Sequence, residues 1–245
     1  MQLEFIFYML TSAQDRAYQY VKNQILSLAL KPGQWIKAQE IAMEAEVSRT
    51  PVREALSRLE QEGFVRRDEG WGYVVCSVTL KDAREFYKVR EVLEAEAARE
   101  AVAHAKVEHL EAMDALLGKA EQARLRNRVS AFRVNTRAFH ASIARLANNA
   151  LLARMLHDLE HRVQLLGAMV FEKNPKRMDE VIEENRAILD AVRKGDTAQA
   201  ETEVRRHVRR AWENYLLYVA EDAGFAPEMS NLNNKGRNSG QAALR

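Results

Sequence analysis

Apolar residues recur along most of this chain at the spacing of amphipathic helices. A first stretch covers residues 12–30 and stops at the Lys-Pro-Gly segment 31–33, and a second, shorter one covers residues 38–46. A third follows the turn at Ser48, which is a suitable N-cap, and has a proline in its first turn. It ends at Gly63, a natural residue to follow a helix C-terminus. The pattern therefore predicts three helices in this part of the chain.

After Gly63 the pattern changes from that of helices to that of strands. Residues 64–67 and 71–78 are typical of β-strands, and Asp68-Glu69-Gly70 between them is typical of a hairpin turn. Helix, helix, turn, helix and hairpin, in this order, is the organisation of a winged helix-turn-helix. We therefore predict a DNA-binding domain of this type over residues 12–78.

The remainder of the chain is predicted to be helical. Thr79-Leu80-Lys81-Asp82 has the form of a capping box and begins a domain over residues 79–221. The tail 222–245 is rich in Asn, Gly and Ser, and we expect it to be disordered. The predicted fold class is mainly α: an N-terminal winged helix-turn-helix with a small β-hairpin wing, then a C-terminal all-α six-helix bundle. The six helical stretches are 80–103, 107–128, 131–147, 150–171, 175–194 and 197–220.

Composition narrows the class of protein. With 47% hydrophobic and 29% charged residues, the chain resembles an ordinary globular protein, and its net charge of +2 does not by itself indicate nucleic acid. Cys76 is the single cysteine, which excludes an internal disulfide and fits a reducing cytoplasm. The apolar run 3–10 is too short to span a bilayer, and Met9 is an alternative start. We expect a cytoplasmic protein without a membrane segment.

The third predicted helix has one apolar and one polar face on a helical wheel. Thr50 and Arg53 point away from the apolar face, Arg49 lies at its border, and Ser48 precedes the helix. Arginine can bind guanine through two hydrogen bonds and hydroxyls bind phosphates, so this end of the helix suits the major groove of DNA. The alternative is an ordinary solvated face. The core-facing positions are Val52, Ala55, Leu56 and Leu59.

The segment around this helix closely resembles the GntR family of bacterial transcriptional regulators. The resemblance rests on Val-Ser-Arg-Thr-Pro-Val-Arg-Glu-Ala-Leu over residues 47–56, on Arg-Leu-Glu-x-Glu-Gly over residues 58–63 and on the glycine-containing wing. It covers residues 14–78 and implies binding to double-stranded operator DNA. Gln39 departs from the family, which often has a basic residue there. By this resemblance the DNA-contacting residues are Ser48, Arg49, Thr50, Arg53 and Gly70.

Residues 80–220 resemble, more weakly, the effector domain of the FadR/VanR branch of this family, the FCD domain. The resemblance rests on the runs 87–94 (YKVREVLE), 135–140 (NTRAFH) and 184–191 (ENRAILDA), with Gly195-Asp196 and His207. It implies a homodimer whose helical bundle binds a small organic acid and thereby controls the affinity for DNA.

Many members of this branch hold a divalent metal through one Asp and three His. Only His140 and His207 keep a metal-binding side chain here, and a protein site for Zn or Ni usually needs three or more donors. Two interpretations follow: a metal-free pocket, or a weak site in which effector oxygens complete the coordination of Zn or Ni. The corresponding positions in this chain are Thr136, His140, Asn185 and His207.

Helical wheels place five polar residues beside apolar stripes, independently of the resemblance. We predict that they line an effector pocket inside the bundle, because a buried cation needs an anion such as a small carboxylate or sugar acid. Two local alternatives stand: Arg90 pairs with an internal Glu such as Glu94, and Asn185 caps a buried carbonyl. The predicted effector-binding residues are Arg90, Thr136, His140, Asn185 and His207.

His157 and His161 superficially resemble the His-Glu-x-x-His motif of zinc proteases. Asp158 stands where that motif has Glu, and both histidines lie opposite the apolar stripe, so we expect them at the surface or at a subunit contact. Our main hypothesis is not an enzyme but a ligand-responsive repressor that binds a pseudo-palindromic operator as a homodimer. The alternatives are a metal-dependent enzyme using His140 and His207 or His157 and His161, and a protein that binds DNA of any sequence.

Overall fold

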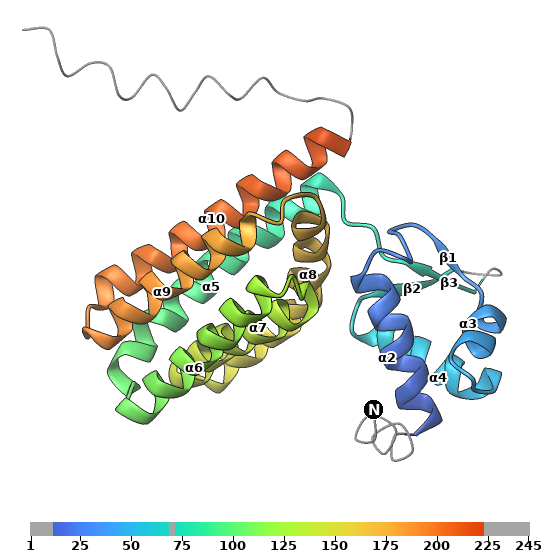
Figure 1. Cartoon of the computed structure of the whole chain (residues 1–245), viewed down its shortest axis with the longest axis horizontal. Coiled ribbons are helices and arrows are strands. Elements are labelled where there is room, and N and C mark those ends of the chain that lie inside the picture. Colours follow the sequence, from blue (N-terminus) through green and yellow to red (C-terminus); the bar gives the residue numbers. More distant parts are fainter. Residues whose placement is uncertain (1–11, 69–71, 223–245) are drawn as a thin grey trace, which may run out of the picture.

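The computed structural model describes residues 12–68 and 72–222. Figure 1 shows two lobes side by side: a small N-terminal lobe of helices and a sheet, and a larger lobe built of helices. The predicted fold class, a winged helix-turn-helix followed by an all-α six-helix bundle, is confirmed. The predictions about Gly70, Met9 and the tail beyond residue 222 lie outside the described residues.

Three helices form the scaffold of the small lobe. α2 (Ala13–Leu26) begins at the N-cap Ser12, whose side-chain oxygen accepts a hydrogen bond from the amide of Asp15. It is shorter than the predicted stretch 12–30, because Leu28 adopts a left-handed backbone conformation (φ 59°) that a right-handed helix cannot continue. α3 (Ala38–Glu44) and α4 (Arg49–Gln61) follow, and all predicted core positions of α4 are fully buried.

A three-stranded antiparallel sheet completes the small lobe. β2 (Val65–Asp68) pairs with β3 (Gly72–Val75), as the predicted hairpin requires, and α4 packs against β2. β1 (Trp35–Ile36) pairs with the other side of β3. Sequence analysis missed β1, since two residues are too few to show the period of a strand.

The helices of the large lobe follow the predicted stretches in order. α5 begins with the predicted capping box, in which the side chains and amides of Thr79 and Asp82 exchange hydrogen bonds. Gly195, with φ of 72°, lies between the last two helices. The helices are α5 (Leu80–His104), α6 (Val107–Leu125), α7 (Val129–Leu146), α8 (Ala150–Lys173), α9 (Arg177–Arg193) and α10 (Thr197–Asp222).

The two lobes are in direct contact. α8 lies on the side of the bundle that faces the small lobe, where α2 packs against it (Figure 1). Buried residues from both lobes belong to one continuous hydrophobic core. Within residues 12–68 and 72–222, no helix has the length and apolar composition needed to cross a membrane.

Candidate effector cavity and DNA-binding surface

A cavity of about 290 Å³ lies inside the large lobe, between α5, α7, α8, α9 and α10. Its volume is close to the lower end of the range for small-molecule sites, roughly 300 Å³. Apolar side chains such as Leu156, Val163 and Val181 form part of its wall. The polar and charged side chains that line it are Tyr87, Arg90, Glu94, Arg133, Thr136, Arg137, His140, Arg145, His157, Glu160, Gln164, Arg177, His207 and Asn214.

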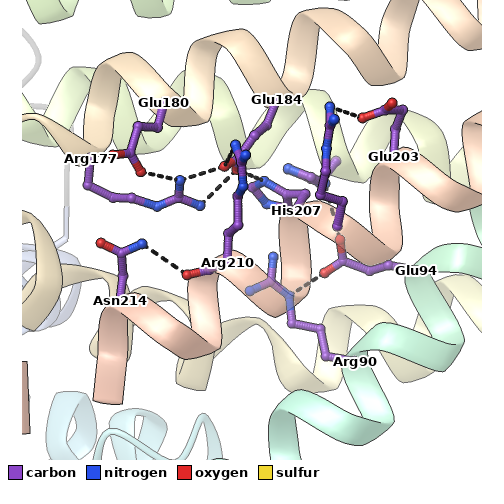
Figure 2. Close-up of polar contacts among 11 residues, drawn as sticks. Arg90, Glu94, Arg177, Glu180, Glu184, Glu203, His207, Arg210 and Asn214 are labelled. Carbon is purple, nitrogen blue, oxygen red and sulfur yellow. Dashed lines mark hydrogen bonds and ion pairs between the residues drawn. The ribbon is translucent and has the colours of Figure 1, made fainter. Parts of the chain in front are cut away.

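Glu184 is the centre of one polar network beside the cavity, shown in Figure 2. Arg177 donates to its two carboxylate oxygens over 2.6 and 2.7 Å, and Nδ1 of His207 lies 2.7 Å from Oε2. Burial raises the pKa of Glu184, but hydrogen bonds from His207 and Arg177 outweigh it and lower the pKa to about 2. The carboxylate is therefore ionised and neutralises Arg177, which is only 2% exposed.

Glu94 on α5 is the centre of a second network. Nε of Arg90 donates to Oε1 of Glu94, and Nδ1 of His140 lies 3.2 Å from Oε2. Burial raises the pKa of Glu94, yet Arg90 and His140 hold it well below its ordinary value. Arg90 is thus a residue of the cavity wall and also the partner of Glu94, so one of the local alternatives considered from the sequence is present.

The imidazoles of His140 and His207 join the two networks. Their rings stack with centroids 4.8 Å apart and an interplanar angle of 27°. Burial lowers the pKa of His207 to about 4 against the raising effect of Glu184. His207 is therefore neutral near pH 7. Because the Glu184 carboxylate only accepts hydrogen bonds, Nδ1 of His207 carries the proton, and Nε2 is left as an acceptor.

Arg133 brings a further positive charge to the cavity wall. Its guanidinium donates to the main-chain carbonyl of Leu26, over 3.2 Å, and to that of Gln164. Arg137, one turn further along α7, differs from Arg133 in having a carboxylate partner, because its Nε lies 2.8 Å from a carboxylate oxygen of Glu160. Burial and the proximity of Arg137 lower the pKa of Arg133 to about 10, so it stays charged near pH 7.

Four of the five predicted effector residues are brought together at the cavity wall. They are Arg90, Thr136, His140 and His207. The hydroxyl of Thr136 lies 3.2 Å from the carbonyls of Phe132 and Arg133 on its own helix. Asn185 is fully buried in α9 and is not among the described residues that line the cavity. Neither polar atom of its side chain has a hydrogen-bond partner in the described part of the chain, so it does not cap a buried carbonyl.

The residues at the metal positions of this branch do not fit a tightly bound metal. Thr136 bonds to its own helix, Asn185 is not on the cavity wall, and His140 and His207 direct Nδ1 at glutamates. Among the described residues, no group of three or more His, Cys, Asp or Glu side chains is arranged to hold a metal ion.

His157 and His161 lie in different surroundings. His157 is exposed, and its Nδ1 lies 3.6 Å from a carboxylate oxygen of Glu160. The expectation of a surface position is wrong for His161, because its imidazole is half-buried where α8 faces the small lobe. Its ring meets the edge of Phe64 with centroids 6.1 Å apart and lies against Gly63. Burial lowers the pKa of His161.

The outer face of α4 presents the predicted DNA-contacting side chains to solvent. Those exposed are Ser48, Arg49, Thr50 and Arg53. Ser48 is the N-cap, although no side-chain capping bond is formed among the described residues. Arg49 donates to the side-chain oxygen of Gln39 over 2.8 Å, so the residue that departs from the family pattern holds this arginine. Arg53 lines a groove between α4 and the wing, together with Arg67 and Tyr73.

Six charged residues of the cavity region were not predicted from the sequence. They are Arg133, Arg137, Arg145, Glu160, Arg177 and Glu184. Arg133 precedes Thr136 by three residues and His140 by seven, so a helical wheel contained the signal. Arg177 and Glu184 share a face of α9 in the same way. However, charged residues on a helix are typical of a solvated surface, and only the tertiary structure shows that these two are buried.

A winged helix with an exposed polar recognition helix, joined to a helical bundle with a polar cavity, defines a two-domain DNA-binding regulator. Comparison with known families shows two matches: the family of bacterial regulatory proteins named gntR over residues 13–75, and the FCD domain over residues 85–210. The chain belongs to the GntR family of transcriptional regulators and carries an FCD domain. It is a regulator and not the metal-dependent enzyme considered as an alternative.

Similar proteins extend over most of the chain. It is 29% identical over 211 residues to the HTH-type transcriptional regulator YdhC of Bacillus subtilis, which covers 84% of this chain and 91% of the relative. It is 30% identical over 201 residues to a Paenarthrobacter nicotinovorans protein described as "Probable D-xylose utilization operon transcriptional repressor", covering 81% and 86%. The structure of Escherichia coli McbR/YncC has a TM-score of 0.71 at 24% identity, covers 87% of this chain and 100% of that chain, and shows the shared fold.

Proposed function

We propose that this protein is a cytoplasmic repressor whose binding to its operator is controlled by a small carboxylate or sugar acid. Two copies bind a pseudo-palindromic operator, and each winged helix occupies one half-site. The acid binds in the cavity of the large lobe and favours an arrangement of the small lobes that fits the operator poorly. The relative from Paenarthrobacter nicotinovorans is named a probable repressor, which supports repression over activation.

The proposed DNA contacts come from the N-terminal end of α4 and from the wing. Arg49 and Arg53 are exposed and project from the first turns of this helix, where guanidinium groups can reach guanine edges in the major groove. Ser48 and Thr50 lie beside the free amides of the helix N-terminus, which is a favourable place for a phosphate. Gly70, in the segment between β2 and β3, is proposed to let the wing backbone approach the DNA.

One observation carries the effector proposal: positive charge on the cavity wall exceeds negative charge. Glu94, Glu184 and Glu160 neutralise three of its arginines. Arg145 is exposed to water, whereas Arg133 is half-buried and has no carboxylate partner among the described residues. A ligand carboxylate supplies the missing charge, and such charge-assisted hydrogen bonds are about twice as strong as neutral ones.

The remaining polar groups suit a ligand that also carries hydroxyls. Nε2 of the neutral His207 accepts a hydrogen bond, and Thr136 and His140 add polar atoms on the same part of the wall. We therefore keep Arg90, Thr136, His140 and His207 in the proposed site, add Arg133, and leave out Asn185. This combination favours a hydroxy acid or sugar acid over an apolar ligand.

A thermal-shift screen tests the effector proposal. Small carboxylic and sugar acids are compared with neutral sugars and alcohols of the same size. Each compound is tested in the presence of a chelator, in the presence of Zn and in the presence of Ni. We expect at least one acid to raise the Tm in the presence of the chelator, while its neutral counterpart has no effect. If no acid raises the Tm, or if the neutral compounds act equally, the proposal is wrong. An effect that requires Zn or Ni would instead support the weak metal site at His140 and His207.

A further inference from the structure

We propose that Arg133 links the effector cavity to the DNA-binding lobe, and that an acid in the cavity breaks this link by drawing the guanidinium away from α2. This inference rests on the proposed function and names the residue through which the bound acid acts. Arg133 is a positioning residue, because it acts on the placement of the small lobe and does not itself contact DNA.

The geometry of Arg133 connects three helices. The side chain extends from α7, donates to the carbonyl of Gln164 on α8, and reaches across the lobe boundary to the carbonyl of Leu26. Leu26 is the last residue of α2, so its carbonyl is one of those that a helix leaves unpaired at its C-terminus. The partial negative charge at this end of a helix attracts a cation. The bond therefore holds α2 against the bundle.

Arg133 combines two properties that no other described residue of the cavity shares. It lines the cavity, and it forms a hydrogen bond to the small lobe. His161 also touches the small lobe, at Gly63 and Phe64, but it is not among the described residues that line the cavity. A ligand in the cavity can therefore reach the lobe contact directly through Arg133.

The charge of Arg133 explains why a ligand would displace it. In the described part of the chain its partners are main-chain carbonyls, which are neutral. A carboxylate in the cavity carries a full negative charge, so it offers the guanidinium a two-pronged ion pair that is stronger than its hydrogen bonds to neutral carbonyls. When Arg133 turns toward the acid, the carbonyl of Leu26 loses its partner, and α2 is released from this side of α8. The angle between the lobes then changes, and with it the spacing of the two DNA-reading helices in a dimer.

Hydrogen–deuterium exchange at residues 27–30 tests the link without DNA. Amides in this segment donate to carbonyls of the last turn of α2, so their exchange reports whether that end is held. In the absence of acid, Arg133→Gln should raise exchange there about tenfold, because a hydrogen bond from a charged donor is lost. Arg137→Gln is the matched control: it removes the same charge from the same wall, one turn away, and should leave this exchange as in the wild type.

Citrate, a small tricarboxylate, serves as the acid in a second experiment. Its binding is detected as a rise in Tm, and in the wild type it should speed exchange at residues 27–30. Arg133→Lys keeps the positive charge but lacks the guanidinium group, whose separate nitrogens donate to the carbonyls of Leu26 and Gln164. We expect this variant to bind citrate while exchange at residues 27–30 is fast with and without it. Arg133→Lys also replaces Arg133→Gln in the first comparison if the latter fails to fold.

The outcomes separate this inference from the proposed function. If citrate or another acid of the screen binds the wild type and exchange at residues 27–30 does not change, the link is disproved and the proposed function stands. Equal exchange in the Arg133 and Arg137 variants disproves the link as well. If no acid binds the wild type, the proposed function fails and the inference falls with it.

Discussion

Single side chains in the cavity region are arranged so that nearly every buried charge has an opposite charge beside it. Glu94 holds Arg90, and Glu184 holds Arg177. The two stacked imidazoles stand between these pairs, and His207 stays neutral because burial disfavours its charged form. Such a site changes its charge balance only when a ligand or a proton enters it.

The protonation of His207 predicts a pH dependence of stability. The unfolded histidine takes up a proton near its ordinary pKa of 6.5, whereas the folded one resists protonation down to about 4. The contribution of His207 to the free energy of unfolding should therefore fall by about 3 kcal/mol as the pH falls from 6.5 to 4 in chelator-treated protein. Urea unfolding at a series of pH values measures this slope.

Two variants make this pH experiment specific. His207→Asn cannot titrate and should show a much shallower slope over the same pH range. His157→Asn removes an exposed histidine from the same bundle and should keep the slope of the wild type. Equal slopes in the wild type and in His207→Asn would show that His207 is not held neutral.

The exposed arginines of α4 give a prediction about DNA. Arg49→Ala and Arg53→Ala should each weaken binding to a selected operator about tenfold or more, because a two-pronged contact to guanine contributes roughly 1–3 kcal/mol of discrimination. Both side chains are exposed, so the Tm should be nearly unchanged. Fluorescence anisotropy with a labelled duplex measures the Kd. Arg154→Ala, at an exposed position on α8, is the control; if all three variants bind alike, the contact assignment is wrong.

The exposed and buried faces of α4 were predicted from the sequence more completely than the lining of the cavity was. The core face of α4 follows from helical periodicity alone, and its exposed arginines follow from the same wheel. The cavity needs side chains from five helices, and no single wheel shows which of them meet. Asn185 illustrates this, because its apolar neighbours along α9 correctly indicate burial but do not say which cavity, if any, it faces.

Among the helices and strands, the end of α4 is one of the places where the two lobes constrain each other. Gly63 follows the helix with φ of 79°, a backbone conformation that favours glycine. A Cβ at this position would lie 2.6 Å from Nε2 of His161 on α8. The recognition helix therefore ends directly against the large lobe.

A substitution at Gly63 tests this contact. Gly63→Ala should lower the free energy of unfolding by about 1–2 kcal/mol through backbone strain, with a further loss because His161 must move. The double variant Gly63→Ala/His161→Ala should recover that further loss but not the strain. Urea unfolding of the two single variants and the double variant measures both parts. A Gly63→Ala protein as stable as the wild type would contradict the close packing described for this site.

The elements that sequence analysis placed least well are those fixed by tertiary contacts. β1 consists of two residues and exists because β3 offers it a partner. The early end of α2 depends on the conformation of Leu28, which periodicity does not reveal. Long helices such as α5 were predicted closely, since an apolar stripe and a capping box mark them locally.

For the whole molecule, the proposed mechanism depends on how the two lobes are held together. The lobes share a continuous core, and the side chains of Arg133 and His161 extend from the large lobe to contact the small lobe. In the proposed dimer, a small rotation of each DNA-binding lobe alters the separation of the two recognition helices, to which operator binding is sensitive.

The proposed dimer also predicts the mass of the particle in solution. Sedimentation of the chain should show a particle of twice the 28.0 kDa chain mass.

In the proposed mechanism, an acid bound in the cavity weakens binding to the operator. This effect is tested by measuring the Kd for a duplex that the protein itself selects from random DNA, with and without the acid that gives the largest thermal shift. We expect the acid to weaken operator binding about tenfold, within the usual range of coupling between two sites, and its neutral counterpart to have no effect. A Kd that is unchanged by an acid that demonstrably binds would show that the cavity does not control DNA binding.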